Sequence, residues 1–119
     1  MFIKCIATGL LLLASTTLLP GVALADDVRM FVRHEVSDYA AWRKAYDSPA
    51  IRSMQKKGGV LAQSVYQGTD DPNDVTVIHD FHSLEAAKAF AALPDLKAAM
   101  EKAGVKGPPT IWYAIRRSK

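Results

Sequence analysis

Cysteine is almost absent from this chain of 119 residues, because the only one is Cys5, close to the N-terminus. A single cysteine excludes an intrachain disulfide, so packing must stabilise the fold. The chain also lacks a strong charge of one sign, since its 15 basic residues face 12 acidic ones and are dispersed. This balance argues against nucleic acid as a partner. Nor does the sequence contain a glycine-rich phosphate loop or a recognisable motif for covalent catalysis.

The N-terminus has the three parts of a secretory signal peptide. Lys4 precedes an apolar run that breaks at Pro20, and the small-residue pattern Ala23-Leu24-Ala25 follows. The run is about 15 residues long, short of the roughly 20 that span a bilayer, so a retained anchor is the weaker alternative. We predict a signal peptide over 1–25 and a mature domain over 26–119 that is periplasmic or secreted, with no membrane contact after cleavage.

Two periodicities divide the first half of the mature domain. Residues 28–36 alternate with a period of two and are rich in valine, which predicts a strand. Ser37-Asp38 supplies a helix N-cap and a first-turn acid. Ser48-Pro49 interrupts and restarts the helix, and Gly58-Gly59 ends it. Three aromatic residues mark its buried side at helical spacing: Tyr39, Trp42 and Tyr46.

The second half repeats this design. Strands are predicted over 60–67, 75–81 and 110–116, and a dense cluster of turn residues separates the first two. Between the last two strands, Ser83 caps a helix that Pro94 divides and that ends near Gly104. The two halves align as an internal repeat, in which Ser37 corresponds to Ser83 and Gly58 corresponds to Gly104.

The order βαββαβ predicts an α+β fold of the ferredoxin-like type. Its sheet is antiparallel with strand order 4-1-3-2, and its two helices lie on one face. The open face receives Arg33 and Asp80, expected to be structural, and the apolar side chains of Phe31, Ile78 and Trp112. Because a monomer seldom exposes such a patch, we predict a homodimer through this face. Alternation assigns the remaining inward side chains to the helix side: Val28, Met30, Val32, Val75, Val77, Phe81, Ile111, Tyr113 and Ile115.

Four segments resemble small dimeric α/β-barrel proteins of the antibiotic-biosynthesis-monooxygenase-like type: 33–42 (RHEVSDYAAW), 70–75 (DDPNDV), 83–90 (SLEAAKAF) and 96–109 (LKAAMEKAGVKGPP). The resemblance covers essentially the whole mature domain. It implies a homodimer whose two sheets pack into a barrel, with a ligand cavity between helices and sheet in each subunit. Members of this group oxygenate polycyclic aromatics without a cofactor, degrade haem, or isomerise or cyclise small metabolites, and many have no assigned activity. The fold alone does not choose among these.

His34 is the candidate catalytic residue. Strand alternation places it on the helix side, near Tyr39 and Trp42, where proton transfer is conceivable. The alternative is a structural histidine that hydrogen-bonds a helix terminus. His79 has the same parity in the third strand, but that strand runs antiparallel to the first and separates the two histidines by about 10 Å or more, too far for a shared metal. The helix that begins at Ser83 contains no histidine to bind haem, so neither a metal nor a cofactor is predicted.

The aromatic residues and His79 are the candidate ligand-binding residues, although side chains of this kind also form cores. We therefore hypothesise that the protein binds a small apolar or aromatic molecule and is a monooxygenase- or cyclase-like enzyme that needs no cofactor. The alternative is a non-catalytic binding or interaction module. A cavity of several hundred cubic ångströms beside a titrating His34 would favour the enzyme. The ligand-binding set comprises Tyr39, Trp42, Tyr66, His79, Phe90 and Tyr113.

Overall fold

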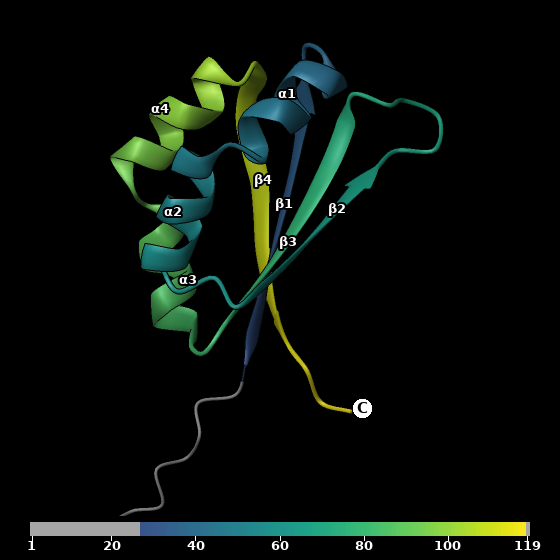
Figure 1. The fold of residues 1–119 in the computed structure, drawn as a ribbon. Coiled ribbons are helices and arrows are strands. Elements are labelled where there is room, and N and C mark those ends of the chain that lie inside the picture. The colour runs from purple at the N-terminus through teal and green to yellow at the C-terminus, as the bar shows by residue number, and fades with distance from the viewer. Residues whose placement is uncertain (1–26, 119) are drawn as a thin grey trace, which may run out of the picture.

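The computed structural model describes residues 27–118, which form one sheet covered by helices on one face (Figure 1). The strands are β1 (Val28–Val36), β2 (Ala62–Gln67), β3 (Asp74–Phe81) and β4 (Val105–Ile115). The helices are α1 (Tyr39–Tyr46), α2 (Pro49–Lys57), α3 (Leu84–Ala91) and α4 (Pro94–Lys102).

The sheet confirms the ferredoxin-like prediction. Its strand order is β2-β3-β1-β4, and each neighbouring pair is antiparallel. All four helices lie on the same face (Figure 1). Each of the two predicted helices is divided in two, because Pro49 and Pro94 begin new helices and cannot donate a backbone hydrogen bond to the turn before.

Local capping explains where the helices begin. Ser48 and Ser83 accept hydrogen bonds from backbone amides in the first turns of α2 and α3. The prediction for α1 was wrong by one residue, because its N-cap is Asp38, whose carboxylate accepts from the Ala41 amide at 2.9 Å. The Ser37 amide instead donates to the carbonyl of Gly104 at 2.9 Å and ties β1 to the start of β4.

The core lies between the helix layer and the sheet. Burial alternates strictly along β3, and along β1 the residues at every second position are buried. The buried strand residues pack against α1 and α3. The face of each strand that is turned toward the helices carries the apolar side chains that the alternation predicted. The core consists of Val28, Met30, Val32, Val36, Trp42, Tyr46, Val75, Val77, Phe81, Ala87 and Phe90.

Strand β4 is longer than predicted, because it begins at Val105 rather than Thr110. Its pairing with β1 shifts between Arg33 and Glu35, where β4 has extra residues around Gly107 and two prolines. Gly107 has a positive φ of 70°, a conformation that suits glycine. Prolines are tolerated because β4 is an edge strand, and an edge strand can lack outward amide donors.

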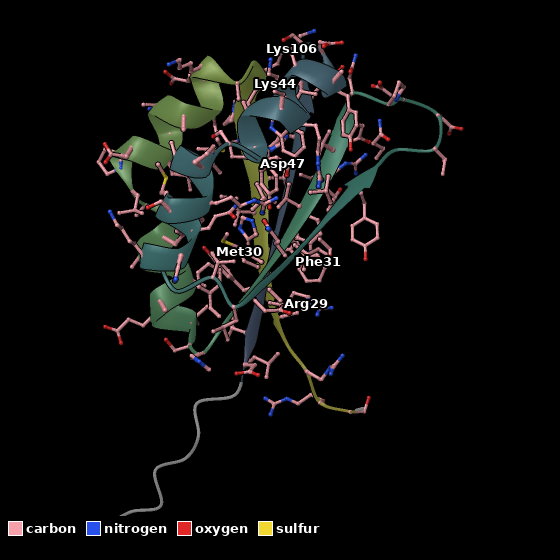
Figure 2. All side chains as sticks on the ribbon, in the orientation of Figure 1. Arg29, Met30, Phe31, Lys44, Asp47 and Lys106 are labelled. Atoms are coloured by element: carbon pink, nitrogen blue, oxygen red, sulfur yellow. The ribbon has the colours of Figure 1, made fainter. Side chains whose placement is uncertain are left out.

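The open face carries the predicted apolar row. Phe31 pairs with Ile78 on one side and Trp112 on the other, and its ring stacks on the Trp112 ring at 5.1 Å. Figure 2 shows Met30 directed toward the helices and Phe31 away from them. No helix within residues 27–118 covers this row (Figure 1).

Two ion pairs flank the row. Arg29 binds Asp80 through two contacts of 2.8 and 3.1 Å, and Arg33 binds Asp74 through two contacts of 2.9 and 2.6 Å. Both ion pairs therefore form within one chain. Arg33 and Asp80, which were expected to be structural, each bind a residue of a neighbouring strand.

Candidate functional site

A cavity of about 60 Å³ lies between the helices and the sheet and is partly open to solvent. β1 and β3 form its floor, and all four helices and β4 contribute to its walls. Most of its lining is apolar. The polar side chains in that lining are His34, Tyr46, Gln55 and His79.

His34 enters the cavity from the end of β1, opposite the irregular part of β4. Only 7% of the residue is exposed, and its ring lies edge-on to Trp42 at 5.6 Å. Burial lowers the pKa of His34, while its own backbone and the Asp74 carboxylate oppose that effect. His34 is therefore an uncharged imidazole at neutral pH.

The Nδ1 atom of His34 has no hydrogen-bond partner among the described residues, and protein atoms enclose it. A buried nitrogen without a partner costs free energy, and the Nδ1 of His79 is the other such side-chain atom among the described residues. The structural alternative for His34 required a hydrogen bond to a helix terminus. At Nδ1 that bond is missing from the part of the chain that the structure describes.

His79 belongs to a hydrogen-bonded network with Tyr46 and Gln63. Its Nε2 lies 2.9 Å from the Tyr46 hydroxyl, which donates to the Gln63 Oε1 at 2.6 Å. A hydroxyl has one proton to donate, so the Tyr46 oxygen accepts from Nε2–H of His79. This network assigns the Nε2–H tautomer to His79 and leaves its Nδ1 as an acceptor.

Burial, and secondarily Arg52, lowers the pKa of His79 to about 4, despite the opposing effect of Asp80. Burial likewise raises the pKa of Tyr46. Both groups are neutral at pH 7. His79 is thus a positioned hydrogen-bond donor. Of the two cavity histidines, His34 is the one that takes up a proton more readily.

Aromatic rings from three elements form a continuous wall. Trp42 stacks on Tyr46 at 4.9 Å, Tyr46 on His79 at 6.2 Å, and Phe90 meets His79 edge-on at 5.7 Å. On the outer side, the guanidinium groups of two arginines lie 5.6 and 5.1 Å from the Tyr46 ring centre. These are Arg43 and Arg52, and both also bind Asp47.

The described residues contain no group of three or more His, Cys, Asp or Glu side chains placed to hold a metal ion. Between residues 27 and 118, no helix is both long and apolar enough to cross a membrane.

Comparison with known families decides the relationship. A family model described as "Domain of unknown function (DUF3764)" matches residues 29–107, from β1 to the start of β4. The chain belongs to the DUF3764 family. The DUF3764 match includes His34, Trp42, Tyr46, Gln63 and His79. No curated protein matches the chain.

Solved structures share the fold of this DUF3764 protein. SnoaB from Streptomyces nogalater, described as a cofactor-independent oxygenase, is 15% identical with a TM-score of 0.63, over 80% of this chain and 97% of SnoaB. The ActVA-Orf6 monooxygenase of Streptomyces coelicolor, in complex with nanaomycin D, is 18% identical with a TM-score of 0.59, over 79% and 90%. A putative antibiotic biosynthesis monooxygenase from Caulobacter crescentus is 17% identical with a TM-score of 0.61, over 80% and 93%. At these identities the likeness establishes the antibiotic-biosynthesis-monooxygenase-like ferredoxin fold.

The structure brings together four of the predicted site residues. His34, Trp42, His79 and Phe90 all line the cavity. Tyr39 contacts Trp42 at 6.0 Å between ring centres, in a second layer behind the cavity lining.

Two predicted residues lie elsewhere. Tyr113 lines a separate surface depression with Val28 and Leu84. Tyr66 pairs with Thr76, between the buried Val75 and Val77, so it points to the open face and is 55% exposed. The expectation that Tyr66 lines the helix-side cavity is corrected, because alternation along β2 places its side chain on the other side of the sheet.

Sequence analysis missed the polar partners of His79. Tyr46 was recognised in the aromatic stripe, with a cavity lining as the alternative to a core role, but it was not among the predicted ligand-binding residues. Gln63 was not recognised at all. Their signals were the helical spacing from Trp42 to Tyr46 and the register of β2, in which Gln63 lies opposite His79. The register is a tertiary feature, so the sequence alone did not reveal it.

Proposed function

We propose that this DUF3764 protein is an exported homodimer that binds one small, mostly apolar molecule per subunit, in the cavity beneath α1 and α4. His34 accepts a hydrogen bond or a proton from that molecule. The single observation that carries the proposal is the position of His34, a buried histidine whose ring lines an apolar, aromatic cavity.

The proposed reaction is oxygenation by dioxygen without a cofactor, the activity named for SnoaB. A substrate CH2 group beside a carbonyl gives a proton to His34, and the resulting carbanion reacts with dioxygen. The CH2 becomes a second carbonyl, and the other oxygen atom leaves as water with the two hydrogens. His34 suits the base because His79 has a pKa of about 4 and its Nε2 proton is engaged with Tyr46.

The homodimer in this proposal forms through the open face. Phe31, Ile78 and Trp112 cross three adjacent strands in one row, and Trp112 is 42% exposed. Burying such a row stabilises an assembly by about 25 cal/mol per Å² of apolar surface. The ion pairs Arg29–Asp80 and Arg33–Asp74 satisfy the charges beside the row. A second copy can therefore cover the row without burying an unpaired charge from these four residues.

A non-catalytic binding module is the second candidate, and the size of the cavity favours it. Ligand pockets usually enclose about 300–1,000 Å³, whereas this cavity measures about 60 Å³. The two candidates differ in the fate of the ligand, because only the enzyme consumes dioxygen with it.

Calorimetric titration with nanaomycin D, the ligand of the Streptomyces coelicolor structure, tests binding and the role of His34. We expect the wild-type protein to bind and His34→Phe to bind about tenfold more weakly, because phenylalanine keeps the packing and removes both nitrogens. His82→Phe is the matched control, since the His82 side chain is 78% exposed at the end of β3. Equal affinity for all three proteins would refute the role of His34. Oxygen uptake with 2-tetralone, an aromatic ketone that has a CH2 group beside its carbonyl, then separates the enzyme from the binding module.

A further inference from the structure

The cavity beside His34 is too small for the ligand that its walls suit. An apolar protein cavity of about 150 Å³ accommodates benzene, and this one measures about 60 Å³. Even a single aromatic ring therefore extends beyond it. The direction of that extension is set by where the cavity is open.

A groove of about 510 Å³ adjoins the cavity between α4 and β4. Ala91, Met100 and Ile111 line both spaces, so these three side chains form the junction between them. The groove continues outward along Val105 and the irregular part of β4. The inner end of the groove therefore begins at side chains that also line the cavity of His34.

The sequence of β4 builds the outer wall of this groove. Gly107 with its positive φ and the following Pro108-Pro109 interrupt the regular pairing with β1. The proline rings present apolar surface and no amide donor, so this part of the strand is poorly suited to pairing with another strand. The wall is therefore better suited to an apolar small molecule.

Of the helices that line the cavity and the groove, α4 can move with the smallest loss of packing free energy. Its N-cap residue, Leu93, makes no side-chain capping bond, and none of its residues is fully buried. The other three helices each have a side-chain cap and at least one buried residue. A small outward shift of α4 would widen the junction at Met100 and expose little of the core.

The charges at the groove cancel. Lys97 and Glu101 lie one turn apart on α4, and they are the two charged residues in the groove lining. A charged outer end of a ligand would gain little from this pair. The groove therefore favours an uncharged ligand.

We infer that the cavity and the groove form one elongated site, which takes an uncharged, elongated and mostly apolar molecule with a hydrogen-bonding oxygen or nitrogen at its inner end. The inner group lies at His34, the molecule passes Met100, and its outer end lies against Pro108 and Val105. This inference rests on the proposed binding function and adds the shape and charge of the ligand.

Titration with 4-phenylphenol, an uncharged, elongated and mostly apolar molecule with a hydroxyl group at one end, tests the inference by NMR. The signals of the His34 ring report the inner end, and the methyl signals of Val105 report the outer end. We expect both sets to shift with the same dissociation constant. Movement of the His34 signals alone leaves the proposed function standing and overturns the elongated site. Movement of the Val105 signals alone, or of neither set, overturns the inference as well, and in those cases the cavity beside His34 does not bind the probe.

Blocking the junction provides the matched comparison. Ala91→Phe fills the shared wall from α3, and Ala89→Phe adds the same ring at an exposed position of that helix. We expect Ala91→Phe to raise the dissociation constant at least about tenfold, and Ala89→Phe to leave it unchanged. Met100→Trp blocks the same junction from α4, so a folding defect in one variant does not decide the test. Wild-type affinity in a folded junction variant would overturn the inference.

Discussion

At the scale of single residues, the most informative side chain is His79, because its environment holds it neutral. Its pKa is about 4 in the folded protein, against an ordinary value of 6.5 that the unfolded chain retains. Between these values the unfolded state binds more protons, so stability is complete above pH 6.5 and falls as the pH drops toward 4. The lowered pKa of His34 acts in the same direction.

We therefore predict that the free energy of unfolding falls by roughly 2–3 kcal/mol between pH 7.5 and pH 4.5 because of His79. Urea unfolding at both pH values measures this loss. In His79→Phe the loss should shrink to the part that His34 contributes. An undiminished loss in that variant would show that His79 is not the group responsible.

Tyr46 holds the polar network together at the same scale. Its hydroxyl contacts both His79 and Gln63, so Tyr46→Phe leaves a buried Nε2–H without its acceptor. We predict a destabilisation of about 1–3 kcal/mol from that orphaned donor. His79→Phe combined with Tyr46→Phe should cost less than the sum of the two single changes, because the donor is then absent. Additive costs in the double-mutant cycle would disprove the coupling.

At the scale of elements, the two glycines that end α2 have different roles. A Cβ on Gly58 would lie 2.4 Å from Cδ2 of Phe90, whereas a Cβ on Gly59 would meet nothing within 4 Å. Gly58 has an ordinary helical φ of −78°, and Gly59 has a positive φ of 88°. Gly58 therefore permits the close approach of α2 to α3, and Gly59 permits the turn.

We predict that Gly58→Ala destabilises the protein by roughly 1–3 kcal/mol through overpacking, and that Gly59→Ala costs about 1 kcal/mol through its backbone. Adding Phe90→Leu should relieve part of the cost of Gly58→Ala and none of the cost of Gly59→Ala. Chemical unfolding of the wild type, the two glycine variants, Phe90→Leu and the two double variants measures both couplings. Equal coupling at the two glycines would contradict the assignment.

The elements also show how far the sequence could be interpreted. Period-two alternation placed the inner faces of β1 and β3, because a face that packs against helices must be apolar at every second residue. The length of β4 escaped prediction, since Gly107-Pro108-Pro109 suggests a loop and only an edge position lets such residues remain in a strand. The face of Tyr66 was missed because the register of β2 depends on its pairing with β3.

At the scale of the whole molecule, the proposed dimer depends on the row of Phe31, Ile78 and Trp112. We predict that Trp112→Glu converts the dimer to a monomer, because the change places a charge where the second sheet packs. Leu84→Glu is the matched control, since Leu84 is 41% exposed and Trp112 is 42% exposed, but Leu84 lies on the helix side. Size exclusion with light scattering measures both masses. A monomeric wild-type protein, or a Trp112→Glu variant that remains a dimer, would refute the proposed interface.

Export is a second prediction at this scale. Residues 1–25 have the pattern of a cleaved signal, and they lie outside the residues that the structure describes. Intact mass spectrometry of protein recovered from the exported fraction should give a chain of 94 residues beginning at Asp26. A full-length chain retained with the cell would contradict export.

The central claim is that the space beside His34, beneath α1 and α4, is a ligand site. A crystal structure of the protein with nanaomycin D tests this claim most directly. We predict density for the ligand against Trp42 and Met100, with one of its oxygen atoms within hydrogen-bond distance of a His34 ring nitrogen. A structure in which nanaomycin D binds only on the outer surface, with Met100 and the His34 ring unmoved, would contradict it.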